Sequence, residues 1–180
     1  LGQALRRGMG DARPILLAAS TREGEEALLL DALEGIAATG LLTVIVPRHP
    51  QRFDEVARLL EARGVRYQRR SAHAATAPET RVVLGDSMGE MFAYYAACDV
   101  AFIGGSLLPL GGQNLIEACA VGKPVLIGPS TFNFTEAVEL AVQAGAAIQV
   151  PDPAALAREA GLLLRDPAAA RRMSQAALAF

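Results

Sequence analysis

Short apolar runs alternate along the chain with longer segments in which apolar residues recur every three or four positions. Short runs rich in Val, Ile and Leu that end at a polar residue, Gly or Pro are typical of buried strands, and the longer period is typical of helices. Strands are predicted over residues 14–20, 41–47, 65–70, 81–86, 100–105, 123–129 and 146–151. Helices are predicted over residues 22–40, 50–64, 87–99, 112–122, 134–145, 152–166 and 167–180, with a loop over 71–80.

This alternation predicts the architecture. Strands that are separated by helices of about 10–15 residues indicate βαβ units and a parallel sheet. We therefore predict an α/β fold, a doubly wound and mostly parallel Rossmann-like sheet with helices on both faces. Residues 13–180 are predicted to form one domain and residues 1–12 a linker or interdomain segment. Ligands of such sheets bind beyond the carboxyl ends of the strands, so candidate site residues are expected there.

Composition narrows the class of protein. The chain has 180 residues, of which 52% are hydrophobic and 20% charged, as in a globular domain that buries a sizeable core. The formal net charge of −2 argues against a nucleic-acid partner. Cys98 and Cys119 lie in apolar helical segments and are predicted to be buried free thiols. The two cysteines and two histidines show no metal-ligand spacing, so we expect neither a metal nor a cofactor.

The hydropathy of the chain and its two ends bear on whether it spans a membrane and whether it is part of a longer protein. No apolar run approaches the roughly 20 residues that a membrane-spanning helix needs, and no signal peptide is evident. The chain begins at Leu1 and ends within a helical pattern. We therefore expect a soluble piece of a longer protein.

Two predicted strands are followed by a serine with a glutamate three residues later. These pairs are Ser20 with Glu23, and Ser87 with Glu90. The spacing fits a capping box, which is a sufficient structural reason for both pairs. A free helix N-terminus would also attract an anion, which is the alternative for the first pair. Gly89 is a poor helix former, and a close approach of the backbone to a ligand would explain it.

The segment "VPRHP" follows another predicted strand. Pro47 ends the strand and Pro50 opens a helix, so Arg48 and His49 lie on a rigid turn. The planar guanidinium of Arg48 suits a phosphate, although a lone surface arginine is often only solvated.

The longest candidate is "GGSLLPLGGQNLIEACAVGKPVL", residues 104–126. Two glycines end a strand, and Gly111 and Gly112 precede a predicted helix, which would leave backbone amides facing an anion. Asn114 and Glu117 are three residues apart and share one helix face. An amide and a carboxylate one turn apart suit a phosphate beside a ribose diol. The alternative is a glycine-rich turn followed by an ordinary helix cap.

No catalytic set is evident from the sequence. The chain lacks a nucleophile elbow, a Walker motif, the G-x-G-x-x-G fingerprint and a Ser-His-Asp arrangement. In "IGPSTFNF", residues 127–134, Asn133 together with Glu136 is predicted to cap a further helix.

Together these segments resemble a known family. In order along the chain, "AASTREGEE", "VPRHPQRFDEV", "GDSMGEM" and "FIGGSLLPLGGQNLIEACAVGKPVLIGPSTFNF" are similar to the C-terminal domain of 3-deoxy-D-manno-octulosonic acid (Kdo) transferases, which are GT-B glycosyltransferases. The resemblance covers nearly the whole chain. It implies the C-terminal half of a GT-B fold and transfer of Kdo from CMP-Kdo to lipid A precursor in lipopolysaccharide biosynthesis. It also implies that the full-length protein acts at the cytoplasmic face of the inner membrane.

The resemblance also implies a set of donor contacts. Contacts to CMP are implied for Pro47, Arg48, Met88, Gly89, Glu90, Asn114, Leu115, Ile116 and Glu117. Further donor contacts are expected at Ser20, Thr21, Gly104, Gly105, Gly111, Gly112 and Gln113. Arg48 and the helix start near Asn114 would meet the phosphate, and Glu117 the ribose. The catalytic base and the lipid acceptor site are expected in an N-terminal domain outside this chain, as is any membrane association, so no catalytic residue is expected here.

The chain departs from the family pattern at two positions. Gln113 stands where the family often has His, and Leu110 where other members often carry a polar residue. Gln113 can still donate a hydrogen bond but does not titrate near neutral pH. Two alternatives remain open at this point. In the first, the chain belongs to another GT-B enzyme, which is a UDP-sugar transferase or an epimerase. In the second, it is a non-catalytic α/β interaction module whose glycines serve only turns.

Overall fold

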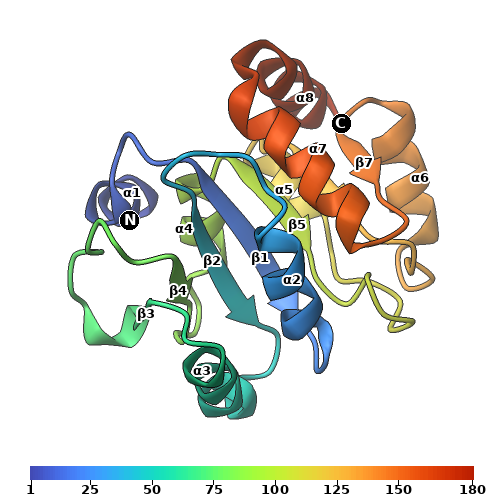
Figure 1. The fold of residues 1–180 in the computed structure, drawn as a ribbon. Coiled ribbons are helices and arrows are strands. Elements are labelled where there is room, and N and C mark those ends of the chain that lie inside the picture. Colours follow the sequence, from blue (N-terminus) through green and yellow to red (C-terminus); the bar gives the residue numbers. More distant parts are fainter.

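The computed structural model describes residues 1–180 and contains a single sheet of seven parallel strands (Figure 1). The strands are β1 (Ile15–Thr21), β2 (Leu42–Pro47), β3 (Tyr67–Arg69), β4 (Val82–Leu84), β5 (Val100–Ile103), β6 (Val125–Ile127) and β7 (Ala147–Gln149). Their order across the sheet is β3-β4-β2-β1-β5-β6-β7, and every neighbouring pair is parallel. Each strand overlaps a range that the apolar runs predicted, so the predicted α/β class is confirmed.

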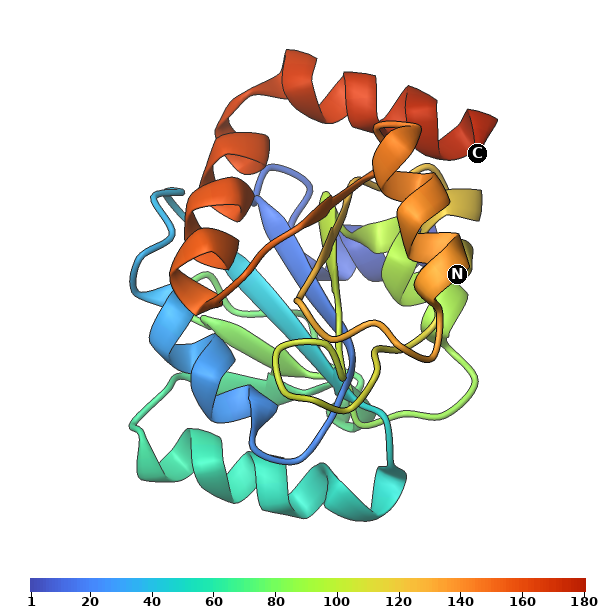
Figure 2. The ribbon, with the colours of Figure 1, turned by 90° about the vertical axis from the view of Figure 1, so that its right-hand side faces the viewer.

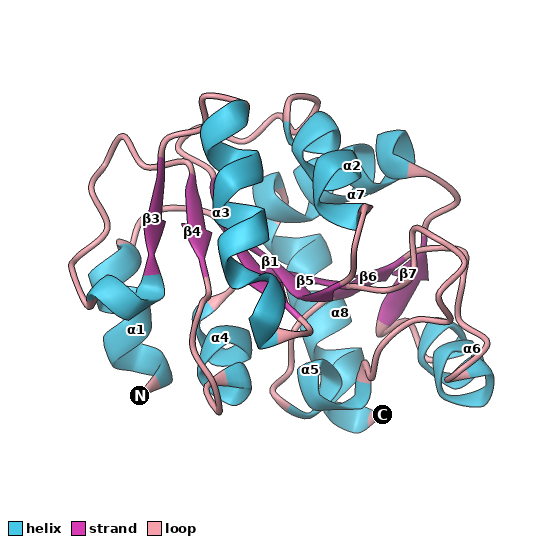
Figure 3. Ribbon diagram, turned by 90° about the horizontal axis from the view of Figure 1, so that it is seen from below, coloured by secondary structure: helices cyan, strands magenta, loops and turns pink.

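Eight α-helices cover the two faces of the sheet. They are α1 (Gly2–Met9), α2 (Glu25–Leu33), α3 (Phe53–Ala62), α4 (Met91–Ala97), α5 (Ile116–Ala120), α6 (Thr135–Gln143), α7 (Pro153–Arg165) and α8 (Pro167–Ala179). One hydrophobic cluster joins α1, α4, α5 and α6 to one face, and a second joins α2, α3 and α7 to the other (Figure 3). The sheet is therefore doubly wound, as predicted.

The central strand β1 explains why the strand signals are continuous apolar runs. Ile15 and Leu17 belong to one hydrophobic cluster, whereas Leu16 and Ala18 belong to the other, and all four are fully buried. Because helices cover both faces of a parallel sheet, both alternating sets of side chains must be apolar. Cys98 and Cys119 are buried in the first cluster, which confirms the prediction of buried free thiols.

Residues 1–12, predicted as a linker or interdomain segment, are largely folded onto the domain. Helix α1 packs against α4 and buries Leu5 and Met9. The guanidinium of Arg6 bonds the carboxylate of Asp99 at 3.0 Å and the carbonyl of Ala97 at 2.9 Å. The segment therefore contributes to the domain core, and a connection to a further domain stays a prediction.

Several helices are shorter than predicted, and for α2 and α5 the reasons differ. Helix α2 ends at Leu33, although Ile36 and Leu41 continue the apolar spacing, because both are core residues of an irregular segment rather than of a helix. Helix α5 begins only at Ile116, because the amides of Gly112 and Gln113 bond carbonyls of the preceding loop instead of starting a helix. The predicted loop over 71–80 opens with a short 3₁₀ turn, Arg70–Ala72.

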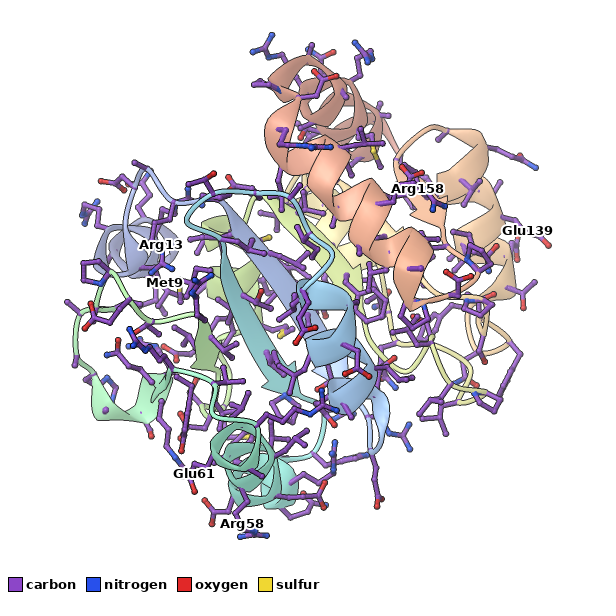
Figure 4. All side chains as sticks on the ribbon, viewed as in Figure 1. Met9, Arg13, Arg58, Glu61, Glu139 and Arg158 are labelled. Carbon is purple, nitrogen blue, oxygen red and sulfur yellow. The ribbon has the colours of Figure 1, made fainter.

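The amino ends of the strands are closed by arginine side chains. Arg13 donates to the carbonyls of Gly40 at 2.9 Å and Thr80 at 2.6 Å, and at longer range to those of Leu41 and Ala77. Figure 4 shows Arg13 near α1, at the end of the sheet from which β1 starts. Arginine donors thus satisfy the loop carbonyls at this edge of the sheet.

The loops at the carboxyl ends of the strands lie at the other edge. Figure 2 shows the connections that follow β1, β2 and β5 gathered at the lower end of the sheet. None of the helices is long and apolar enough to cross a membrane. The candidate residues of the site come mainly from these connections.

Candidate functional site

A cavity of about 420 Å³ lies beyond the carboxyl ends of β1, β2, β4 and β5. Of the predicted contacts, it is lined by Ser20, Pro47, Arg48, Met88, Gly89, Glu90, Gln113, Asn114 and Glu117. Its remaining lining residues are Val46, Pro50, Phe53, Ser87, Met91, Tyr94, Tyr95 and Phe134. The structure therefore brings together residues from four separate predicted motifs.

The topology explains why the motifs converge here. Strand β1 pairs with β2 on one side and with β5 on the other, so the chain leaves β1 in one direction and returns to its other side. This reversal of strand order is the switch point at which open α/β sheets bind ligands. The cavity lies at that switch point.

Ser20 lies at an irregularity in β1 rather than in a capping box. Its φ of 59° is in the left-handed region, and the pairing of β1 with β2 shifts between Ala19 and Thr21. Helix α2 begins after Gly24 with no side-chain cap, so the predicted box of Ser20 with Glu23 is wrong. A strained non-glycine residue is held by its surroundings and is often found at a binding site.

Arg48 is placed by backbone contacts, and its side chain is exposed. Its amide donates to the Thr21 carbonyl at 2.9 Å, which joins the turn after β2 to the end of β1. The guanidinium has no hydrogen bond or ion pair within the chain, although it lines the cavity. The hydroxyl of Thr21 is fully enclosed and unpaired, and Thr21 does not line the cavity.

The segment after β4 also lacks its predicted capping box. Helix α4 begins after Glu90 with no side-chain cap, and the Ser87 hydroxyl lies 2.5 Å from the Tyr94 hydroxyl. Glu90 instead forms a two-point ion pair with Arg70, at 3.2 and 3.0 Å. The Ser87 hydroxyl and this arginine lower the pKa of Glu90. Gly89 has a φ of 72°, a conformation that glycine adopts most readily and that explains this residue without a ligand.

The glycine-rich loop does not offer free amides, which corrects the predicted anion cradle. The Gly105 amide donates to the Glu25 carboxylate at 2.8 Å, and the Gly111 amide to the Ser130 hydroxyl at 2.9 Å. The Gly104 and Gly112 amides bond the carbonyls of Ala19 and Gly105. None of these four glycines lines the cavity. Gly104 is required by packing, because a Cβ there would overlap the carbonyl of Ser20.

The buried carboxylate of Glu25 holds this loop from behind. It accepts hydrogen bonds from the amides of Arg22, Gly105, Ser106 and Leu107, at 2.8–3.1 Å. Burial raises the pKa of Glu25, and the four amides oppose that rise. Because four donors and no acceptor face its oxygens, the ionised form fits this position.

Asn133 is a second anchor of the loop rather than a helix cap. Its side-chain amide donates to the carbonyls of Leu110 at 3.2 Å and Gly112 at 3.4 Å, and α6 begins without a side-chain cap. The predicted cap formed by Asn133 with Glu136 is therefore wrong. The sequence does not indicate that Glu25 and Asn133 hold this loop, since apart from the nearby Arg22 amide their partners lie some 20 to 80 residues away.

The start of α5 provides the free groups that the glycines do not. The Asn114 side chain accepts from the Ile116 amide at 2.9 Å, whereas the amides of Asn114, Leu115 and Glu117 have no acceptor within the chain. The carboxylate of Glu117 likewise has no partner and lines the cavity. The Leu115 side chain is fully buried, and that of Ile116 is exposed outside the cavity.

Sequence reasoning missed two tyrosines in the cavity wall. Tyr94 and Tyr95 lie on α4 and are each 2% exposed. Burial raises the pKa of Tyr94 to about 12 and also raises the pKa of Tyr95. The signal that would have found them is their place one turn after Glu90, on a helix that follows a strand's carboxyl end.

The charged side chains and free amides at the cavity suit the binding of a ligand. Arg48 supplies a positive charge, Glu117 a negative one, and the unpaired amides near Asn114 supply donors. This set fits a phosphate with an adjacent hydroxyl-bearing sugar. No group of three or more His, Cys, Asp or Glu side chains is placed to hold a metal ion.

Comparison with known proteins identifies the family. Residues 61–180 match the model of the glycosyl transferases group 1. The chain belongs to that family. A solved structure, the C-terminal CMP-Kdo binding domain of WaaA from Acinetobacter baumannii, superposes with a TM-score of 0.92 at 32% identity and covers 98% of this chain and 93% of that one. The chain thus has the fold of the C-terminal Rossmann-like domain of GT-B enzymes, and it belongs with the Kdo transferase domains.

Curated relatives agree with this assignment. The 3-deoxy-D-manno-octulosonic acid transferase of Bordetella pertussis is 50% identical over 93% of this chain, and that of Haemophilus influenzae is 40% identical over 91%. The chain spans about two fifths of the length of these relatives, 41% and 39%. HepE from Anabaena in complex with UDP and glucose, 20% identical with a TM-score of 0.72, shares the fold.

Proposed function

We propose that this domain binds the nucleotide part of CMP-Kdo in a glycosyltransferase that transfers Kdo to lipid A precursor. The observation that carries the proposal is the cavity at the switch point, where the unpaired Arg48 and Glu117 converge in a Kdo transferase domain fold. The names of the relatives and the CMP-Kdo binding domain of WaaA support the donor. The acceptor, and a place at the cytoplasmic face of the inner membrane, belong to the full-length protein.

Each part of the cavity has a role in this proposal. Arg48 and the unpaired amides near Asn114 bind the phosphate, and Glu117 accepts from the ribose. Leu115 and Ile116 take part through their backbone, since their side chains do not line the cavity. Pro47 and Met88 form apolar walls with Gly89, beside a Glu90 that is already paired with Arg70.

The chemistry that follows is stabilisation of the leaving group. When the bond between Kdo and the CMP phosphate breaks, negative charge develops on that phosphate. Preorganised donors aimed at developing charge accelerate such steps, which is the task of Arg48 here. The base that activates the acceptor hydroxyl comes from outside this chain, so the domain alone binds nucleotide and catalyses nothing.

The proposal is tested by calorimetric titration of the chain with CMP and UMP. Arg48→Ala should weaken CMP binding by about tenfold or more, because a charge-assisted contact to phosphate is lost. Arg58→Ala is the matched control, since Arg58 is an exposed arginine on α3 that points away from the domain (Figure 4). Saturation at about 100 times the dissociation constant should stabilise the fold by about 2.7 kcal/mol.

The same titration separates the alternatives. Tighter binding of UMP than of CMP would indicate another nucleotide-sugar enzyme of this fold. Absence of saturable binding for both nucleotides would favour a non-catalytic module and overturn the proposal.

A further inference from the structure

Tyr95 has a buried side chain whose hydroxyl has no partner in the chain. The side chain is 2% exposed, lines the cavity, and forms no hydrogen bond through its hydroxyl. Among the side-chain polar atoms that lack a partner, only the hydroxyls of Thr21 and Thr43 are fully enclosed. The hydroxyl of Tyr95 is therefore not fully enclosed and accounts for part of the small exposed area of this residue. Because a buried tyrosine normally finds a hydrogen-bond partner, the Tyr95 hydroxyl is free to bond a ligand that enters the cavity.

The neighbouring tyrosine shows what a satisfied phenol looks like in the same helix. Tyr94 is equally buried and lines the same cavity, but its hydroxyl lies 2.5 Å from that of Ser87. The chain thus supplies a partner to Tyr94 and none to Tyr95. A difference in burial does not explain this contrast, because both tyrosines are 2% exposed.

Glu117 lies near the phenol of Tyr95. Helices α4 and α5 pack together, both residues line the cavity, and the carboxylate adds to burial in raising the pKa of the phenol. The two groups do not bond each other. A carboxylate accepts only, whereas a phenol donates and accepts, so the two together match two neighbouring hydroxyls of one sugar. A phosphate at the same place would be repelled by the carboxylate.

We propose that the Tyr95 hydroxyl contacts a ribose hydroxyl of the bound nucleotide and, together with Glu117, selects ribonucleotides over deoxyribonucleotides. This inference rests on the nucleotide binding proposed above. It adds a specificity-determining residue from α4 to the loops that line the cavity. Tyr95 takes no part in bond breaking, because its role is to hold the sugar.

The experiment compares CMP, 2′-deoxy-CMP and 3′-deoxy-CMP by calorimetric titration of the unmodified chain and the Tyr95→Phe variant. The unmodified chain should bind both deoxy compounds more weakly than CMP, because one lacks the hydroxyl that faces Glu117 and the other lacks the hydroxyl that faces Tyr95. For the compound without the Tyr95 contact the loss should be about 3- to 10-fold, the effect of one hydrogen bond. Tyr95→Phe should weaken CMP binding by a similar factor and leave binding of that deoxy compound unchanged. Its thermal midpoint without nucleotide should equal that of the unmodified chain, because no bond within the chain is lost.

Tyr94→Phe is the matched control. It removes a hydroxyl that is paired with Ser87, so any loss of affinity should be the same for all three nucleotides. An equal loss across the three nucleotides for Tyr95→Phe would overturn the ribose contact in favour of another part of the ligand.

Each remaining outcome also decides between the two proposals. If the unmodified chain binds CMP but Tyr95→Phe binds it equally well, the inference about Tyr95 fails and the proposed function stands. Equal binding of CMP and both deoxy compounds by the unmodified chain overturns the inference without any variant. Failure to bind CMP at all overturns the proposed function and this inference with it.

Discussion

Two regions meet at the loop of residues 104–113, the framework behind it and the cavity in front. Behind the loop, Glu25 is fully buried and its carboxylate accepts four backbone hydrogen bonds. In front of it, Glu117 lines the cavity with no partner. Both are glutamates at one edge of the sheet, yet only one is satisfied by the chain. A satisfied buried carboxylate stabilises the fold, whereas an unpaired one beside a cavity is free to bind a ligand.

The largest effect is expected at Glu25. Glu25→Ala removes the acceptor for four amides, several of them buried, and should lower the free energy of unfolding by about 3 kcal/mol or more. Urea denaturation measures this loss. Glu23→Ala is the control, because Glu23 is exposed and makes no hydrogen bond through its side chain. A loss below about 1 kcal/mol at Glu25 would contradict the assignment of Glu25 to the framework.

A smaller loss of stability is expected at the amino ends of the strands. Arg13→Ala removes four hydrogen bonds to loop carbonyls and should lower the free energy of unfolding by about 2 kcal/mol. Because this edge is remote from the cavity, CMP affinity should not change. Denaturation and titration of the same variant test both statements, and weaker CMP binding would break the separation between framework and cavity.

Glu117→Ala should show the opposite pattern. The free energy of unfolding should stay within about 0.5 kcal/mol of the unmodified chain, because the carboxylate has no partner to lose. CMP affinity should fall by about tenfold, which corresponds to about 1.4 kcal/mol. A variant that unfolds readily yet binds CMP normally would place Glu117 with the framework instead.

The smallest effect concerns Glu90, which lines the cavity but is paired with Arg70. The Ser87 hydroxyl and Arg70 lower the pKa of Glu90 below its ordinary value of 4.5. Its contribution to stability is therefore present above that pH and is lost as the pH falls through the lowered pKa. Thermal midpoints between pH 3 and 7 should show less acid sensitivity for Glu90→Gln, and an unchanged profile would count against the ion pair.

The sheet could be predicted from the sequence because its strands are buried on both faces. Their apolar runs are local and continuous, and glycine, proline or polar residues mark their ends. Asp152 likewise caps α7 by accepting from the Ala155 amide at 2.8 Å, at the end where the predicted helix began. Features that depend on residues close together in the sequence could therefore be predicted.

The candidate site was predictable only in part. Arg48, Asn114 and Glu117 follow strands, and parallel strands bring their carboxyl ends to one edge. The acceptors of the glycine amides were not predictable, because Glu25 lies 80 residues before Gly105. The two capping boxes failed for a related reason, since Ser20 was drawn into the end of β1 and Glu90 toward Arg70. The expected roles of the site residues stay predictions until binding is measured.

The anchoring of the loop from behind has a consequence for how such domains diversify. The side chain of Gln113 makes no hydrogen bond, and its backbone amide is held by the Gly104 carbonyl whatever side chain the residue carries. Exchanges at this position therefore change the wall of the cavity without removing a hydrogen bond that holds the loop.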